Sequence, residues 1–160
     1  MDSIEVELKV LIECLKKKEK ALSQIASITE NQGFVLGSGL SHDEVYSFFM
    51  QMNVEKQEFI QRVLQCDQVF ENVFQNVGPV LDENPDSFTE QVRIMQELIR
   101  SVMDLDVQIR VTEDENSAIL NSALAEVQAR VAKPDSISGG EYGNNKMLDA
   151  YKSQSRHRKG

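Results

Sequence analysis

The stretch EKQEFIQRVLQCDQVFENVF, residues 55–74, decides the fold. It contains no Gly, Pro or His, and its apolar residues recur three or four positions apart. This spacing is typical of an amphipathic helix with a heptad seam. The same register extends from Val45 to Val77, and Lys56 is its one polar break. The pattern predicts a helix over residues 42–77 with an apolar face wide enough for a bundle, on which Phe59, Val63 and Phe70 are expected to be buried.

Two further helices flank this one. Residues 3–32 carry a heptad seam that only Lys18 interrupts, and the glycine-rich stretch GFVLGSGLS (33–41) follows. Residues 85–131 form the third predicted helix. The second helix is expected to begin at a capping box formed by Ser41 and Glu44 and to end at Gly78-Pro79. The third is expected to begin with Asn84 as N-cap, followed by Pro85.

Short connections force consecutive helices to run antiparallel. We therefore expect an all-α, coiled-coil-like, up-down-up three-helix bundle over residues 1–132. Predicted helix lengths of roughly 29, 36 and 46 residues leave the third helix too long for its neighbours to cover. Residues 133–160 are rich in turn-forming and polar residues and are expected to form a flexible tail.

The third helix changes character along its length. Its apolar seam is interrupted at Glu113 and Asn116, which indicates a buried polar layer, a local exit of the seam to solvent, or a polar contact for a partner. Beyond this break lies an apolar stripe that the shorter helices are not expected to cover, and it is the predicted partner-binding surface. Its residues, with three from the tail that fold over or extend it, are Ile119, Leu120, Ala123, Leu124, Val127, Val131, Met147, Leu148 and Tyr151.

Composition excludes several classes of function. The net charge is −9, although residues from 133 onward contain six Lys or Arg and three Asp or Glu. An acidic body argues against nucleic-acid binding, and no apolar run is long enough to span a membrane. The two histidines and two cysteines lie in no ligand or nucleophile motif, so we expect no enzyme activity, metal or cofactor. Cys14 and Cys66 are expected as free thiols in a cytoplasmic protein without a signal peptide.

Two segments resemble a known family. Residues 55–74 combine Glu-Lys before an apolar pair with a later Cys-Asp-x-x-Phe, and residues 93–116 follow a Leu-Gln-x-x-Ile…Leu-x-x-x-Ile…Glu-x-x-Asn progression. The second set of matching positions is Met95, Gln96, Ile99, Leu105, Ile109, Glu113 and Asn116. Over roughly residues 4–131 the chain is similar to flagellar export chaperones of the FlgN/FliT kind.

This resemblance implies a small acidic cytoplasmic chaperone without enzymatic activity. Its partners would be flagellar hook-associated or filament-cap subunits, together with components of the export apparatus. It would cover the helical terminal segments of these subunits and prevent premature assembly before secretion, by capture of a helix in a groove. Two alternatives stay open: a homodimeric coiled-coil adaptor that uses the same seams, and a helical-bundle metal enzyme, which would need inward Glu and Glu-x-x-His ligands.

Overall fold

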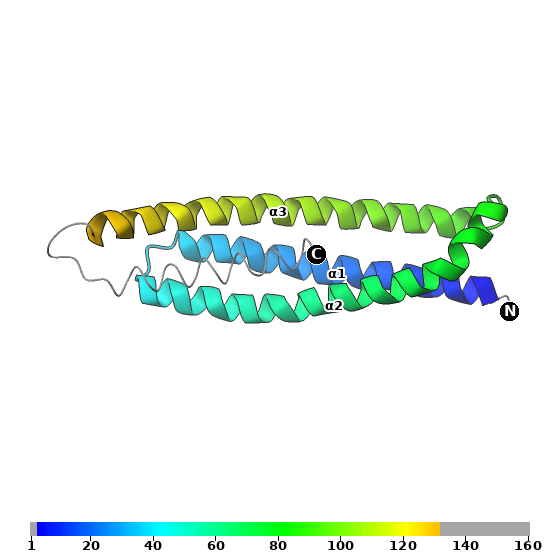
Figure 1. Cartoon of the computed structure of the whole chain (residues 1–160), viewed down its shortest axis with the longest axis horizontal. Helices are drawn as coiled ribbons and strands as arrows, with labels where there is room; N and C mark the ends of the chain where they lie inside the picture. The colour runs from blue at the N-terminus through cyan, green and yellow to red at the C-terminus, as the bar shows by residue number, and fades with distance from the viewer. Residues whose placement is uncertain (1–2, 132–160) are drawn as a thin grey trace. The chain divides into compact units, whose positions relative to one another are not determined.

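The computed structural model describes residues 3–131, which form three α-helices and no strand. They are α1 (Ser3–Leu36), α2 (His42–Glu83) and α3 (Thr89–Val131) (Figure 1). The predicted all-α three-helix fold is confirmed. No helix in this part of the chain is both long and apolar enough to cross a membrane. The predicted tail, with Met147, Leu148 and Tyr151, lies outside the described residues.

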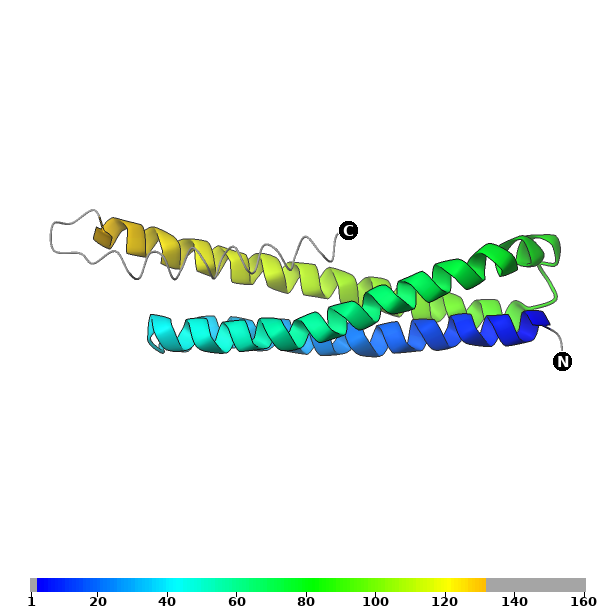
Figure 2. The ribbon, with the colours of Figure 1, turned by 60° about the horizontal axis from the view of Figure 1, so that its bottom comes forward.

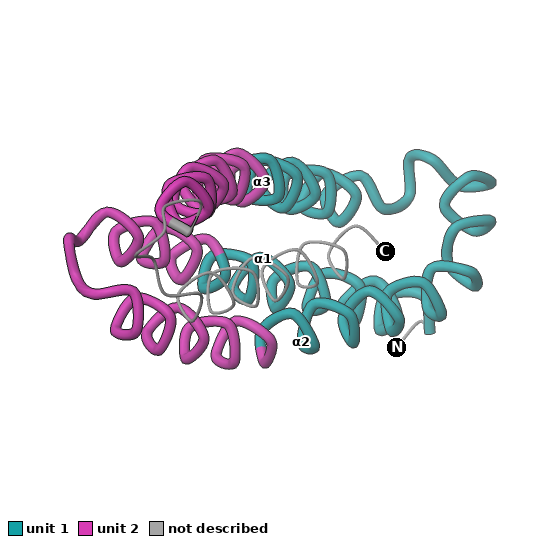
Figure 3. The backbone as a smooth tube through the Cα atoms, turned by 60° about the vertical axis from the view of Figure 1, so that its left-hand side comes forward, with its two compact units in different colours: residues 1–25, 59–107 teal, residues 26–58, 108–160 magenta. Residues whose placement is uncertain are grey.

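The chain divides into two compact units, and each takes one segment from every helix (Figure 3). Unit 1 comprises residues 1–25 and 59–107, and unit 2 comprises residues 26–58 and 108–160. Within each unit the segment of α2 runs antiparallel to those of α1 and α3 (Figure 1). The up-down-up order expected from the short connections is therefore present in both units.

The start of α2 follows the sequence prediction. The backbone N–H of Glu44 donates to Ser41 Oγ at 3.3 Å, and Ser41 Oγ donates to Glu44 Oε1 at 3.0 Å. The first bond satisfies one backbone N–H that has no partner inside the helix, and the second joins the two side chains of the predicted capping box. The preceding loop turns at Gly39, whose φ of 77° lies in the left-handed region that favours glycine.

The end of α1 was predicted four residues too early. Gly33 does not terminate the helix, which continues to Leu36. Glycine weakens a helix without forbidding it. A Cβ atom at Gly33 would lie 2.7 Å from Oδ1 of Asn116 in α3, so the missing side chain permits a close approach of the two helices within unit 2.

The connection between α2 and α3 also differs from the prediction. Pro79 lies inside α2, which ends at Glu83 (Figure 2). Asn84 is not the N-cap of α3; its backbone N–H and its Nδ2 both donate to the carbonyl of Val80 at 3.0 Å and close the C-terminus of α2. Residues 85–88 form a turn, and α3 begins at Thr89.

The third helix is longer than α1, which contains 34 residues, but the prediction that it is also much longer than α2 was wrong. α2 contains 42 residues and α3 contains 43. The error arose because a Gly-Pro pair was taken as a helix end and Asn84-Pro85 as a helix start. Proline fixes φ at a helical value, so the chain can continue through it with one backbone hydrogen bond fewer.

The core of unit 1 is apolar. Leu8, Leu11 and Leu15 of α1 pack with Val77 of α2 and Met95 of α3, and all five side chains are buried. The heptad seam predicted for α1 is thus confirmed here. The prediction for α2 was less accurate: Phe59, Val63 and Phe70 are only half-buried, whereas Ile60 beside the predicted seam is 2% exposed.

The core of unit 2 contains fewer large apolar side chains. Phe49 of α2 and Leu120 of α3 are buried together, with Leu36, Val45 and Leu124 packed against them. The next positions along the same seams are polar. The interior of unit 1 is therefore apolar, whereas that of unit 2 is partly polar.

Candidate functional site

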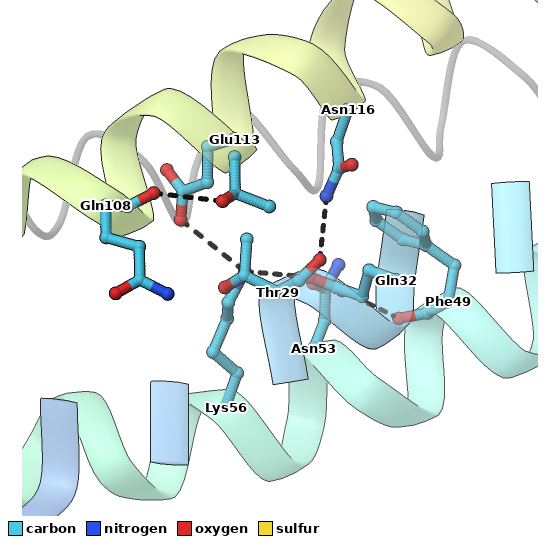
Figure 4. A network of polar contacts seen from close by, with 9 residues as sticks. Thr29, Gln32, Phe49, Asn53, Lys56, Gln108, Glu113 and Asn116 are labelled. Carbon is cyan, nitrogen blue, oxygen red and sulfur yellow. Dashed lines mark hydrogen bonds and ion pairs between the residues drawn. The ribbon is translucent and has the colours of Figure 1, made fainter. Parts of the chain in front are cut away.

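Unit 2 contains a buried polar layer to which each helix contributes two residues three positions apart. These residues are Thr29 and Gln32 of α1, Asn53 and Lys56 of α2, and Glu113 and Asn116 of α3, and all are at most 4% exposed (Figure 4). Residues three apart lie on the same face of a helix. The three pairs therefore occupy seam positions, where apolar side chains stand elsewhere.

The layer is closely hydrogen-bonded. Lys56 Nζ donates to Gln32 Oε1 at 2.8 Å and lies 3.5 Å from Glu113 Oε1, while Gln32 Nε2 donates to Asn53 Oδ1 at 2.6 Å. Asn116 Nδ2 donates to the carbonyl of Thr29 at 2.9 Å. Buried polar groups need such partners, since an unpaired one would be costly. Figure 4 shows these side chains pointing toward one another rather than into an open site.

This layer decides among the three interpretations of Glu113 and Asn116. Their burial excludes an exit of the seam to solvent and favours a buried polar layer. Lys56, predicted only as a break in the seam of α2, is the cation of the layer. Sequence reasoning missed Thr29, Gln32 and Asn53, although a polar pair at i and i+3 on each predicted seam was a usable signal.

The distal stripe on α3 is partly covered within unit 2. Leu120 and Val127 are buried, Ala123 and Leu124 are half-buried, and Ile119 is 41% exposed. The expectation of a bare stripe is wrong for Leu120 and Val127, which are both buried. Phe49 and its neighbours from α1 and α2 cover Leu120. Val131 ends α3, and the predicted tail residues lie outside the described range.

Unit 1 carries a surface that the sequence did not predict. An open cavity of about 870 Å³ lies between α1 and α2, and no residue of α3 lines it. We call it the α1–α2 groove. Its apolar lining residues are Val6, Val10, Ala21, Phe59 and Val69. Two of these, Val6 and Val69, are 45% and 44% exposed, and neither belongs to the heptad seam of its helix.

Polar groups line the α1–α2 groove together with these apolar side chains. Lys9, Lys17 and Lys20 of α1 and Arg62 of α2 also line the α1–α2 groove, with Glu13 as its acidic residue. The guanidinium carbon of Arg62 lies 4.8 Å from the centre of the Phe59 ring, in the geometry of a cation–π contact. The groove therefore combines apolar and basic lining residues, and we call its four cations, Lys9, Lys17, Lys20 and Arg62, the basic rim.

The two cysteines lie between this groove and a second cavity. Cys14 and Cys66 line the α1–α2 groove and also a cavity of about 240 Å³ to which all three helices of unit 1 contribute. Both are free thiols. Burial raises the pKa of each thiol, and Cys66 raises the pKa of Cys14 further. Both shifts favour the protonated thiol, which is a poorer nucleophile than the thiolate.

The described residues offer little for metal chemistry. Within residues 3–131, no group of three or more His, Cys, Asp and Glu side chains is placed to hold a metal ion.

Comparisons with models of protein families, with curated proteins and with solved structures found no match to this chain.

Proposed function

We propose that this protein is a non-catalytic chaperone that captures an amphipathic helix of another protein. The observation that carries the proposal is the α1–α2 groove, in which apolar side chains from two antiparallel helix segments stay open to solvent. A three-helix unit with an apolar groove has room for a fourth helix, and four-helix bundles are filled in this way. Capture of a helix in a groove is a common mode of peptide recognition.

The dimensions of the groove suit this occupant. Its lining residues extend from Val6 to Gln24 along α1 and from Phe59 to Val69 along α2. At a rise of 1.5 Å per residue these segments measure about 27 Å and about 15 Å. A partner helix of roughly three to five turns would contact both. Such a contact would cover the valine side chains that are exposed in the free protein.

The resemblance to FlgN/FliT-like chaperones supplies the identity of the partner in this proposal. The clients are flagellar hook-associated or filament-cap subunits, bound through helical terminal segments in the cytoplasm before export. Covering these segments prevents premature assembly, and release needs only a competing site of higher affinity. We assign the client to the α1–α2 groove rather than to the distal stripe of α3, because Leu120 and Val127 of that stripe are buried.

A homodimeric adaptor is the second candidate. The observation that favours it is a further apolar face on α3 of unit 1, where Ile99, Met103 and Val107 are 39%, 61% and 58% exposed. A second copy could place this face in the α1–α2 groove. Such a dimer would satisfy both apolar surfaces without any client.

Matched double substitutions test the proposal. Val10→Ser with Val69→Ser removes apolar contact from the groove, and Val54→Ser with Val111→Ser makes the same change at exposed valines outside it. Binding of helical terminal segments from hook-associated and filament-cap subunits would be measured by calorimetric titration. We expect the groove variant to bind about tenfold more weakly, since each buried CH₂ contributes about 0.8 kcal/mol, and the control to bind normally.

Two results would contradict this assignment. Equal affinity of both variants would exclude the α1–α2 groove as the client site. Loss of a dimer in sedimentation experiments on the groove variant, with no client bound by the unsubstituted protein, would establish the adaptor instead.

A further inference from the structure

The charge of the α1–α2 groove is opposite to that of the chain. The protein has a net charge of −9, whereas the groove is lined by Lys9, Lys17, Lys20 and Arg62 and by one acid, Glu13. Glu13 also lies 3.7 Å from the exposed Lys16, which offsets part of its charge. The groove is therefore a basic site on an acidic protein.

These four cations are available to a ligand. None of them lies within ion-pair distance of a carboxylate among the residues that the structure describes. Lys18, by contrast, pairs with Asp67 and lines the second cavity instead of the groove. The lysines at 9, 17 and 20 follow helical spacing along α1, and Arg62 is held over Phe59 on α2. Positive charge thus lies on both helices that form the groove.

We infer that the α1–α2 groove selects an amphipathic helix whose apolar stripe is flanked by Asp and Glu residues. This inference rests on the proposed function and adds the charge of the partner to it. The apolar stripe would contact the valines and Phe59, while the flanking carboxylates would face the lysines and Arg62. Complementary charge of this kind selects among partners and speeds their association.

Two other occupants fit the charges less well. Residues 133–160 of the chain carry twice as many basic as acidic residues, so the basic rim would repel them. An anionic membrane surface would attract the rim but repel the remainder of residues 1–132, which carry almost all of the acidic side chains. An acidic helix meets only the groove and avoids this repulsion.

Three synthetic 18-residue peptides provide the test. All share one apolar stripe of Leu at helical spacing, and their flanking positions carry Glu, Gln or Lys. Binding to the full chain would be measured by fluorescence anisotropy at low and high NaCl concentration. We expect the Glu peptide to bind about tenfold more tightly than the Lys peptide at low salt, because several exposed ion pairs act together. High salt should reduce this difference.

Charge-reversed variants locate the effect. Lys17→Glu with Lys20→Glu should reverse the preference, so that the Lys peptide binds more tightly than the Glu peptide. Arg100→Glu with Arg130→Glu changes the net charge equally at exposed residues that do not line the groove, and it should leave the preference unchanged. All four substituted residues are exposed, and the melting temperature would confirm that both variants fold.

The possible failures are distinguishable. If all three peptides bind equally, and Val10→Ser with Val69→Ser weakens each of them, helix capture stands and the charge preference is wrong. If none of the peptides binds, both proposals fall. Sedimentation with vesicles that contain anionic lipid, in the absence of peptide binding, would show that the basic rim serves a lipid surface and would also overturn the inference.

Discussion

The two units are built from segments of the same three helices, but their interiors differ in polarity. Unit 1 has an apolar core and still leaves apolar side chains open in the α1–α2 groove. Unit 2 places six polar side chains at the centre of its bundle, and every buried polar or charged residue within 3–131 lies in this unit. Apolar packing tolerates many arrangements, whereas a hydrogen-bonded layer favours one alignment of the helices. We therefore expect the polar layer to fix the alignment of the helices in unit 2, whereas unit 1 leaves apolar side chains exposed.

The largest expected effect comes from breaking the buried ion pair of unit 2. Lys56→Met leaves Glu113 as a buried charge without its cation and removes the donor to Gln32. Removing one partner of a buried pair typically costs about 3–5 kcal/mol. We expect a loss of this size in the free energy of unfolding, measured by urea denaturation and followed by circular dichroism.

The double variant Lys56→Met with Glu113→Leu is the control. Replacing a whole buried pair by apolar residues is often neutral or stabilising. The double variant should therefore recover most of the lost stability. If Lys56→Met alone costs less than about 1 kcal/mol, the layer contributes little to stability.

A cavity in the core of unit 1 should have the next largest effect. Leu11 is fully buried, and Leu→Ala substitutions at such sites cost about 2–5 kcal/mol. Hydrogen exchange measured by mass spectrometry would report the change separately in residues 59–107 and 26–58. Faster exchange in the first range alone would indicate that the units open independently. Equally faster exchange in both ranges would show that the two units unfold together. The units would then differ in the polarity of their interiors but not in stability.

The apolar seams of the helices could be predicted from the sequence, but the roles of the polar residues that interrupt them could not. Leu8, Leu11 and Leu15 were expected to be buried because a heptad pattern defines one face of a helix. Lys56 was seen only as an interruption, since a buried lysine is rare unless its charge is compensated. The compensation comes from Glu113, which lies 57 positions further along the chain, and a single sequence does not show that pairing.

The helix ends and the candidate site show a second limit of prediction from the sequence. Asn84 and Pro85 are common at the start of a helix, yet here Asn84 closes the preceding one. Local preference could not distinguish these roles because the same side chain can bond to either helix end. The α1–α2 groove was missed for a different reason. Val10 and Val69 lie outside the predicted heptad seams, and a seam pattern does not show that apolar residues beside it gather into one surface between two helices.

Gly33 tests the close approach of α1 and α3 in unit 2. An Ala side chain would overlap Oδ1 of Asn116, so Asn116 would have to rotate and lose its bond to the carbonyl of Thr29. We expect Gly33→Ala to destabilise by about 1–3 kcal/mol, although alanine favours a helix by about 1 kcal/mol. Gly37→Ala, one residue beyond the end of α1, is the control for the added methyl group, since the nearest atom there is 3.8 Å away. A stabilised Gly33→Ala variant in thermal melts would show that Asn116 moves freely.

The smallest effect is expected at the ion pair of unit 1. Lys18 Nζ lies 2.6 Å from Asp67 Oδ1, which is closer than the 3.5 Å between Lys56 and Glu113. The distances alone would rank this pair as the stronger one. Its side chains are, however, 25% and 47% exposed, so water already solvates both charges in the folded protein and in the unfolded chain. Exposed pairs contribute at most about 1 kcal/mol. We expect Lys18→Met to change the free energy of unfolding by less than that amount, and Asp67→Asn to do the same. A loss above about 2 kcal/mol in urea denaturation would mean that burial does not explain the difference between the two ion pairs.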